Sequence, residues 1–312
     1  MLTEKQAEET KSWIETPPLS PPLRRMTGEL IERQNGLDKL ADPLQQWLRS
    51  LSRLPQVARL KDILHGTWLG HSLHPAVTDV PVGSWTATML LDCTWLASGS
   101  EEMGKAADLT LVLGLAGAGV SALSGLTDWS ETDATDRRVG LAHGLLNAGV
   151  ALTNLTSYGL RLAGKRRSGI ALSALGYCLT LFSSYLGGEL SLAKAIGVNH
   201  VAWQEGPEDF VPVIALDDLP TGRLVRVEAA GMPALLWRDN QQIYAIAATC
   251  SHLGGPLDEG TCENGVVTCP WHGSRFRLSD GSVVNGPAVY AQPSFAVRVR
   301  QGKVELRRLE HA

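Results

Sequence analysis

The sequence predicts a multidomain protein, with an all-α bundle of four transmembrane helices followed by a small all-β domain. Four apolar runs lie between residues 80 and 188, and Asp92 is the one charged residue within them. Each run has the roughly 20 residues that a helix needs to cross a bilayer. Beyond residue 205, short β-branched segments alternate with Gly, Asn and Asp, which is the pattern of strands joined by turns.

The composition excludes several classes of protein. The 312 residues are enough for two domains, and the formal net charge of −4 offers no basic surface for nucleic acid. Five cysteines are an odd number, and Cys93 and Cys178 lie in apolar runs, so a disulfide framework is not expected. The polar, Pro-rich start has no apolar core behind basic residues, and we expect no secretory leader.

Two segments precede the apolar runs. Residues 1–26 are polar and Pro-rich, and we expect a disordered tail. Residues 27–70 place apolar residues at helical spacing opposite charged ones, with basic residues near the end, so we expect an amphipathic helical segment. Such a segment either lies on a membrane surface or packs on its own protein, and the sequence leaves both readings open.

The apolar runs predict a membrane domain over residues 71–200. Its helices are expected at about 77–100, 107–127, 139–162 and 168–190. They are rich in Gly, Ala, Ser and Thr, which suits close helix packing in lipid, and charged loops separate them. A buried soluble bundle is the alternative, but four such runs in succession make it the weaker one.

The β domain is expected over residues 205–310 and contains two similar short loops. The first reads TCSHLGGPL from Thr249, and the second reads TCPWHGSRF from Thr268. They supply a Cys-x-His and a Cys-x-x-His pattern, with 16 residues between the first histidine and the second cysteine. Two cysteines and two histidines are a ligand set for zinc, and equally for an iron–sulfur cluster.

With the Gly286–Ala288 stretch and the small β domain around them, these loops resemble a Rieske domain. The resemblance covers about a third of the chain and favours a [2Fe–2S] cluster over zinc. It implies that Cys250 and Cys269 hold one iron, and that His252 and His272 hold the other. Because histidine is neutral where cysteine is an anion, the histidine-bound iron accepts the electron.

The residues around the loops look more like a Rieske ferredoxin than like the Rieske proteins of quinol-oxidising complexes. The extra disulfide cysteines of those proteins are absent, and Phe276 replaces a tyrosine donor, which implies a reduction potential below the top of the Rieske range. The resemblance implies a Ser274 hydrogen-bond donor near the cluster and a covering loop that includes Gly286 and Pro287. Cys262 lies between the motifs and is expected to be a free thiol.

The chain is not expected to be a self-contained oxygenase. Ring-hydroxylating oxygenases carry a second site, a mononuclear iron on two histidines and a carboxylate. Only 40 residues follow His272, and His311 is the sole histidine among them. We expect His311, like His65, to be an ordinary surface residue.

The membrane domain is also similar to a known family. The stretch LHGTWLGHSLHPAVTDVPVGSW, with His74-Pro75 followed by Pro81, and the later Gly140-Leu-Ala-His143 segment resemble a family of small predicted membrane proteins of unassigned function. Some members of that family carry a Rieske domain behind it. The resemblance covers about residues 60–200 and implies no activity.

Several polar residues are expected at the membrane face that carries the β domain. With four crossings, these are His71, His74, Asp79, Asp128, Trp129, His143, Asn147 and His200. Three readings stay open: His74 and His143 ligate a haem b, the group binds a quinone and takes its protons, or the residues cap and link helices. Asp92 lies nearer the opposite face, where it either belongs to a proton path or pairs with another helix, and we favour the pairing.

These patterns predict a multi-pass cell-membrane protein that transfers single electrons through a Rieske [2Fe–2S] cluster to or from a redox partner, haem b or quinone. The first alternative is a ferredoxin that its helices tether to the membrane to serve a soluble reductase or oxygenase. The second is a non-enzymatic redox sensor. Lys and Arg residues divide evenly between the two faces, so they do not decide the membrane orientation. The missing leader, the long polar N-terminal segment and the disulfide-free loops favour the cytoplasmic side for the β domain.

Overall fold

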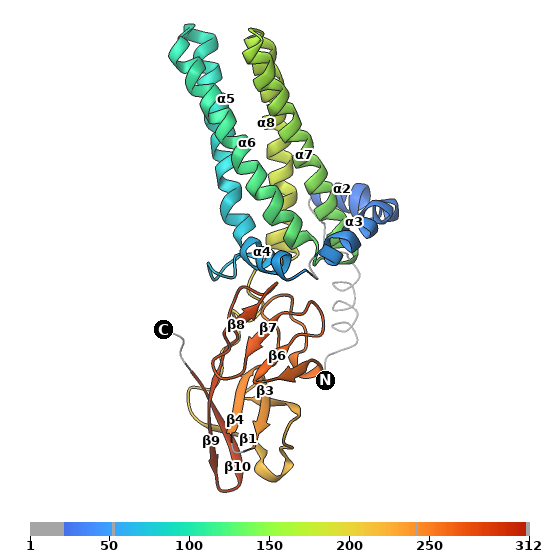
Figure 1. Cartoon of the computed structure of the whole chain (residues 1–312), viewed down its shortest axis with the longest axis vertical. Coiled ribbons are helices and arrows are strands. Elements are labelled where there is room, and N and C mark those ends of the chain that lie inside the picture. The colour runs from blue at the N-terminus through green and yellow to red at the C-terminus, as the bar shows by residue number, and fades with distance from the viewer. Residues whose placement is uncertain (1–21, 52–53, 241, 310–312) are drawn as a thin grey trace, which may run out of the picture.

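The computed structural model describes residues 22–51, 54–240 and 242–309. Four long helices form one end of an elongated molecule and a β domain forms the other, with short helices at the junction (Figure 1). The predicted order of an all-α region before an all-β domain is therefore confirmed. Most of the predicted tail lies outside the described residues, but its last part belongs to helix α2, Pro22–Thr27, which corrects the prediction there.

The four long helices form two hairpins, with close packing inside each. They are α5 (Leu73–Ser98), α6 (Glu101–Trp129), α7 (Ala134–Leu162) and α8 (Arg166–Gly188). Each begins a few residues before its predicted span, because a helix continues through a polar first turn that an apolar count leaves out; Ser100 Oγ, for example, accepts from Met103 N. A Cβ atom on Gly114 would lie within 2.3 Å of the Trp85 ring, so α5 and α6 approach closely there.

Beside a small apolar core, the bundle buries many small polar side chains, and it exposes many large apolar ones. Its buried side chains include Thr88, Ser121, Ser124, Asn154, Ser157, Ser173, Thr180 and Ser183, whereas its exposed ones include Leu90, Leu109, Leu113, Leu123, Leu152, Leu155, Leu175 and Leu181. A soluble bundle has the reverse distribution, and small polar residues at helix interfaces are typical of packing in lipid. Within the described residues, two helices are long and apolar enough to cross a membrane, α6 and the Arg166–Ala193 helix that continues α8.

The predicted amphipathic helical segment is a series of short elements. They are η1 (Gly28–Glu32), η2 (Asn35–Leu37), α3 (Asp38–Leu51) and α4 (Pro55–His65). Gln45 on α3 donates to the carbonyls of Trp129 and Thr132 at 2.8 and 3.0 Å. These contacts support the reading in which α3 packs on its own protein, although its Leu40, Leu44 and Trp47 side chains are exposed.

The β domain is built from three small antiparallel sheets. One contains β1 (Val211–Ala215), β10 (Lys303–Arg308) and β9 (Phe295–Arg300); the second β2 (Leu224–Ala229), β3 (Met232–Asp239) and β4 (Gln242–Ala247); and the third β5 (Thr261–Glu263), β6 (Val266–Thr268), β7 (Arg275–Arg277) and β8 (Val283–Asn285). The first two sheets share one apolar core. A second core lies beside the third sheet and includes Cys250, Cys269 and Phe276.

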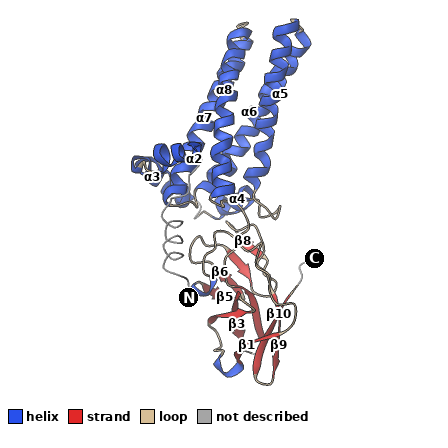
Figure 2. Ribbon diagram, turned by 180° about the vertical axis from the view of Figure 1, so that it is seen from behind, coloured by secondary structure: helices blue, strands red, loops and turns tan. Residues whose placement is uncertain are grey.

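The β domain rests with its third sheet toward the helical region (Figure 2). Asp62 of α4 accepts hydrogen bonds from Gly286 N at 2.9 Å and from Asn285 Nδ2 at 3.2 Å. In the connecting segment, His200 N donates to Ser251 O at 3.1 Å. The two cysteine loops therefore lie at the junction between the domains.

Candidate metal centre

The two cysteine loops have the same backbone conformation. In each loop, the cysteine N–H donates to the carbonyl of the residue five positions later. The cysteine carbonyl accepts from the N–H of the residue four positions later. The bonds run from Cys250 to Gly255, Gly254 to Cys250, Cys269 to Ser274 and Gly273 to Cys269, with lengths of 2.8, 2.9, 2.8 and 3.1 Å. Gly254 and Gly273 adopt φ of +78° and +75°, which glycine adopts without strain. The similar sequences of the two loops thus form the same backbone turn.

The turns bring the cysteines together in the interior. Cys250 and Cys269 are 1% and 3% exposed. The hydrogen bond between their thiols raises the pKa of Cys250 and lowers that of Cys269 to about 6. Backbone N–H groups of Trp271 and His272 also lower the pKa of Cys269, and such donors favour the thiolate that binds metal. A Cβ atom on Gly255 would lie 3.0 Å from Cys269 Sγ, so only glycine leaves the sulfur its space.

The turns also bring the histidines together. The rings of His252 and His272 have centroids 5.0 Å apart and planes at 85°. Burial lowers the pKa of His252 to about 3, so this ring is neutral, the form in which histidine binds metal. Its Nδ1 atom is buried without a hydrogen-bond partner, and a metal ion is the partner that such an atom lacks.

The side chains form two pairs and do not surround a single point. Within the described residues, no three or more His, Cys, Asp or Glu side chains are placed to hold one metal ion. A structural zinc needs four ligands around one ion, whereas a Rieske cluster takes two cysteines on one iron and two histidines on the other. The arrangement fits the cluster, which, when bound, supplies a one-electron redox centre.

Ser274 and Phe276, which we predict to lie near the cluster, lie at the end of the second cysteine loop. Ser274 is fully buried, and its Oγ accepts from Ala288 N at 3.0 Å, which ties the second loop to the Gly286–Ala288 stretch. Phe276 is buried in the core beneath the cysteines. Cys262 is partly buried on β5 and is a free thiol, as the sequence predicts.

The outward edge of the histidine pair faces the helical bundle. His272 Nε2 lies 3.7 Å from a carboxylate oxygen of Asp133, in the α6–α7 connection. His252 lines a cavity of about 20 Å³ together with His65, Asp128 and Pro287. Since a cavity of about this size holds one water molecule, little space separates the His252 ring from the end of the bundle.

His65 is not the surface residue that the sequence predicts. It is 2% exposed, and its Nδ1 lies 2.8 Å from Asp128 Oδ1, while its Nε2 is buried without a partner. It ends α4 just before Gly66, where the chain turns at a φ of +90°; a Cβ atom there would lie 2.3 Å from His71 O, so the turn requires glycine. The signal that sequence reasoning missed is the position of His65 inside the LHGTWLGHSLHP stretch that carries the membrane-family resemblance.

The polar residues expected at this face do not form one site. His71 and Asp79 are exposed, and Asp128 pairs with His65. His200 Nε2 lies 3.0 Å from Ala195 O in the connecting segment. Trp129 is buried, and its Nε1 donates to the carbonyl of Arg137 at 2.8 Å.

His74, His143 and Asn147 form a separate group inside the bundle. The two imidazole centroids are 6.4 Å apart. His74 Nδ1 lies 2.9 Å from Ser121 O, and His143 Nδ1 lies 3.0 Å from Ser183 O. Asn147 Nδ2 is 3.1 Å from His143 Nε2.

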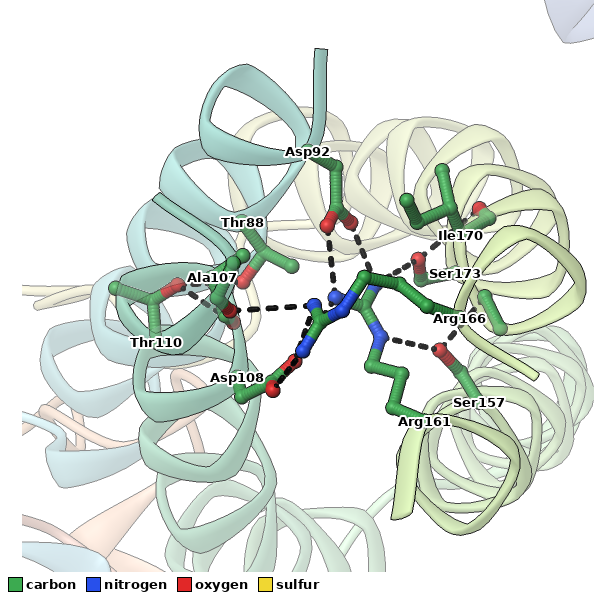
Figure 3. Close-up of polar contacts among 12 residues, drawn as sticks. Thr88, Asp92, Ala107, Asp108, Thr110, Ser157, Arg161, Arg166, Ile170 and Ser173 are labelled. Carbon is green, nitrogen blue, oxygen red and sulfur yellow. Dashed lines mark hydrogen bonds and ion pairs between the residues drawn. The ribbon is translucent and has the colours of Figure 1, made fainter. Parts of the chain in front are cut away.

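The far end of the bundle contains a buried ion network that joins all four helices (Figure 3). Arg161 of α7 pairs with Asp92 of α5 and Asp108 of α6, and donates to Ser173 Oγ of α8 at 2.9 Å. Arg166 binds the same Asp108. The predicted pairing of Asp92 with another helix is confirmed. The arginine partners were not predicted: Arg161 lies near the end of a predicted helix, and Arg166 lies in a predicted loop.

Two segments of the chain match known families. Residues 209–296 match the Rieske [2Fe–2S] domain, and residues 70–200 match a family described as predicted membrane protein (DUF2231).

Relatives of known name match the β domain. The chain is 33% identical over 96 residues to ferredoxin CarAc of Metapseudomonas resinovorans, which covers 30% of this chain and 90% of that protein. It is 34% identical over 108 residues to apoptosis-inducing factor 3 of Mus musculus, covering 34% of this chain but only 18% of that protein's length. The ferredoxin of carbazole 1,9a-dioxygenase from Nocardioides aromaticivorans IC177 is 28% identical, with a TM-score of 0.31, over 31% of this chain and 96% of that one. The chain therefore belongs to the Rieske [2Fe–2S] family through its β domain, and it joins that domain to a predicted membrane protein domain.

Proposed function

We propose that this protein is a membrane-bound electron carrier whose Rieske cluster exchanges single electrons with a redox group, haem b or quinone, at the adjoining face of the bundle. One observation carries the proposal: the histidine pair faces the membrane domain. His272 lies beside Asp133, and His252 lines the cavity with His65 and Asp128. The histidine-bound iron takes up the electron, so its most direct exit is toward the bundle.

An exposed aromatic side chain next to one of the histidines supports a soluble partner. Trp271 is 56% exposed, and its ring centroid lies 6.4 Å from that of His272. Exposed aromatic residues are frequent anchors of protein interfaces. Relatives of the β domain are named as ferredoxin components of dioxygenase systems. A membrane-tethered ferredoxin that serves a soluble reductase or oxygenase is thus the second candidate function, and a redox sensor is the third.

Rapid-mixing kinetics on the full chain in lipid vesicles test the proposal. The cluster is reduced chemically, and its reoxidation is followed after mixing with a vesicle-soluble quinone or with a water-soluble one-electron acceptor. Asp133→Lys places a cation beside His272 at the bundle side, and Trp271→Ala removes the exposed ring at the solvent side.

The proposal predicts that Asp133→Lys slows only electron exchange through the membrane side, and that Trp271→Ala slows only exchange with the soluble acceptor. If only Trp271→Ala slows electron exchange, the protein is a membrane-tethered ferredoxin and the proposal is wrong. A sensor would show neither effect, because its function does not depend on turnover.

We propose further that the β domain is on the cytoplasmic side, which the disulfide-free cysteines support. A reporter enzyme that is active only in the periplasm, fused after the last residue, should be silent. An active reporter would reverse this assignment.

A further inference from the structure

The two helical hairpins repeat the same polar positions. His74 lies 18 residues before Asp92 on α5, and His143 lies 18 residues before Arg161 on α7. Eighteen residues are five helical turns, so each histidine shares a helix face with the charged residue at the far end. Since Asp92 and Arg161 bond directly, the faces that carry the two histidines are turned toward each other.

The second helix of each hairpin holds its histidine in the same way. His74 bonds to the carbonyl of Ser121, and Gly125 lies four residues further on α6; His143 bonds to the carbonyl of Ser183, and Gly187 lies four residues further on α8. A Cβ atom on Gly125 would lie 2.6 Å from the His74 ring, and one on Gly187 would lie 3.3 Å from the His143 ring. The histidines are therefore equivalent members of a two-fold arrangement.

The hydrogen bonds fix the chemistry of the outward nitrogens. A carbonyl only accepts, so Nδ1 is the protonated nitrogen of each neutral ring and Nε2 keeps its lone pair. The contact of Asn147 Nδ2 with His143 Nε2 agrees, because the amide nitrogen is a donor. Metal-bound histidines commonly donate their other N–H to a backbone carbonyl. Nε2 is thus the nitrogen of each ring that a metal would bind, and at His143 the metal would take the place of the Asn147 amide. A nitrogen lone pair suits a metal better than the carbonyl oxygens of a quinone.

We propose that His74 and His143 would together hold one haem iron, a proposal that rests on the proposed electron-transfer function. Two imidazoles on opposite sides of one metal have centroids roughly 6 Å apart, given metal–nitrogen bonds of about 2.0–2.1 Å, and the observed separation is 6.4 Å. No third His, Cys, Asp or Glu in the described residues joins them. Two ligands suffice for a metal that brings its own equatorial donors, as haem iron does.

A buried hydroxyl beside the pair lacks a partner. Ser121 Oγ is enclosed without a hydrogen bond, on the residue whose carbonyl holds His74. Buried polar atoms are normally paired, so this one points to a polar group that binds next to the histidines. A haem held there would exchange single electrons with the cluster, one gained for each one lost, and no bond would be made or broken.

The test is haem content and spin state of the full chain, purified in detergent from cells supplied with a haem precursor. The wild-type protein should contain one haem per chain, with a low-spin ferric EPR signal, beside the signal of the reduced cluster. His74→Gly and His143→Gly should each lose the low-spin signal and keep the cluster signal, which reports that the β domain is folded. Added imidazole should restore the low-spin signal, an effect that a structural role of either histidine does not produce.

His71→Gly is the matched control, because His71 is exposed in the same segment and should leave the haem unchanged. The proposal is overturned if wild-type protein with an intact cluster holds no haem, even after titration with haemin. It is equally overturned if both glycine variants keep low-spin haem. Haem-free protein whose cluster still reacts with quinone would retain the proposed function and remove this site. Low-spin haem on the histidines, without electron exchange between the cluster and the membrane domain, would retain this site and remove the proposed function.

Discussion

At the scale of single residues, the candidate site depends on where protons are held. Ser251 and Ser274 are both fully buried beside the two cysteines, yet their hydroxyls have different roles. Ser251 Oγ donates to Tyr290 O at 2.7 Å, so its proton is not available for a hydrogen bond to the cluster. Ser274 Oγ accepts from Ala288 N, so its own proton remains available for a hydrogen bond to a sulfur of the cluster.

Ser274→Ala should lower the reduction potential of the cluster. The reduced cluster carries the more negative charge, and a hydrogen bond to a charged group contributes about 1.5–3 kcal/mol. For a one-electron couple with about 59 mV per tenfold, this corresponds to a decrease of roughly 60–130 mV, measured by potentiometric EPR titration. Ser251→Ala is the matched control and should change the potential much less. An equal decrease in both variants would contradict the assigned role.

The junction should show a pH dependence set by Glu131, which lies outside the long helices. Burial is the largest single effect and acts to raise its pKa, but the charge and hydrogen bond of Lys61, together with His65 and the Ser130 hydroxyl, lower the pKa below the ordinary 4.5. A lowered pKa stabilises the folded state above pH 4.5, and this stabilisation is lost as the pH falls through the folded-state value.

Lys61→Met should therefore lower the thermal unfolding midpoint of the full chain at pH 6. The difference from wild type should shrink as the pH falls below about 4.5. Lys105→Met, at the exposed far end, is the control. A midpoint difference that is independent of pH would contradict a stabilising role of the Lys61–Glu131 ion pair.

At the scale of elements, the Asp92–Arg161 network sets the rotation of α5 and α7. Both side chains are 1% exposed, and the guanidinium group also binds Asp108, Ser157 and Ser173. Ionisable groups at such depth are costly unless paired. Because His74 and His143 share faces with Asp92 and Arg161, the far-end network also aligns the histidines.

Asp92→Asn should destabilise the bundle by about 3–5 kcal/mol, because it leaves the Arg161 charge buried with one partner fewer. Titration with a denaturing detergent, followed by circular dichroism, measures this. The double variant Asp92→Leu with Arg161→Met should recover much of the loss, since an apolar pair often replaces a buried ion pair without cost. Glu101→Gln removes an exposed pair and should leave the midpoint unchanged. A double variant no better than the single one would contradict this account.

The sequence was informative wherever function depends on local pattern. The strand-rich domain and the four long helices follow from spacing and apolar length, and the proposed cluster ligands follow from the resemblance of two short loops that share one backbone turn. It was less informative about elements that depend on distant partners. α3 and α4 are separate helices because they pack on the end of the bundle, and His65 is buried because Asp128 lies opposite it. Such contacts join residues far apart in the chain and leave no periodic signal.

At the scale of the whole molecule, the central feature is how the β domain meets the bundle. Asp62 accepts from Gly286 N and Asn285 Nδ2, and Ser72 Oγ donates to Gly197 O at 3.0 Å. These bonds hold the histidine edge of the cluster against α4 and the α6–α7 connection. The domain arrangement thus decides which partner the cluster can reach.

Asp62→Ala should loosen this junction without unfolding either domain. The amide of Gly286 loses its acceptor, so its hydrogen exchange should accelerate by about tenfold, as expected for a hydrogen bond of roughly 1–1.5 kcal/mol. Hydrogen-exchange mass spectrometry of the peptide around Gly286 measures this. Asp79→Ala, at an exposed position on α5, is the control. Unchanged exchange in Asp62→Ala would show that the junction does not depend on this contact.

Pulsed EPR of the reduced full chain, with iron and zinc analysis of the same sample, tests the central claim most directly. The account predicts iron without zinc, and a paramagnetic cluster whose unpaired electron couples to two histidine nitrogens. Each coupling should disappear separately in His252→Cys and His272→Cys. Zinc in place of iron, or a cluster without nitrogen coupling, would contradict the assignment of Cys250, His252, Cys269 and His272 as the ligands of a Rieske centre.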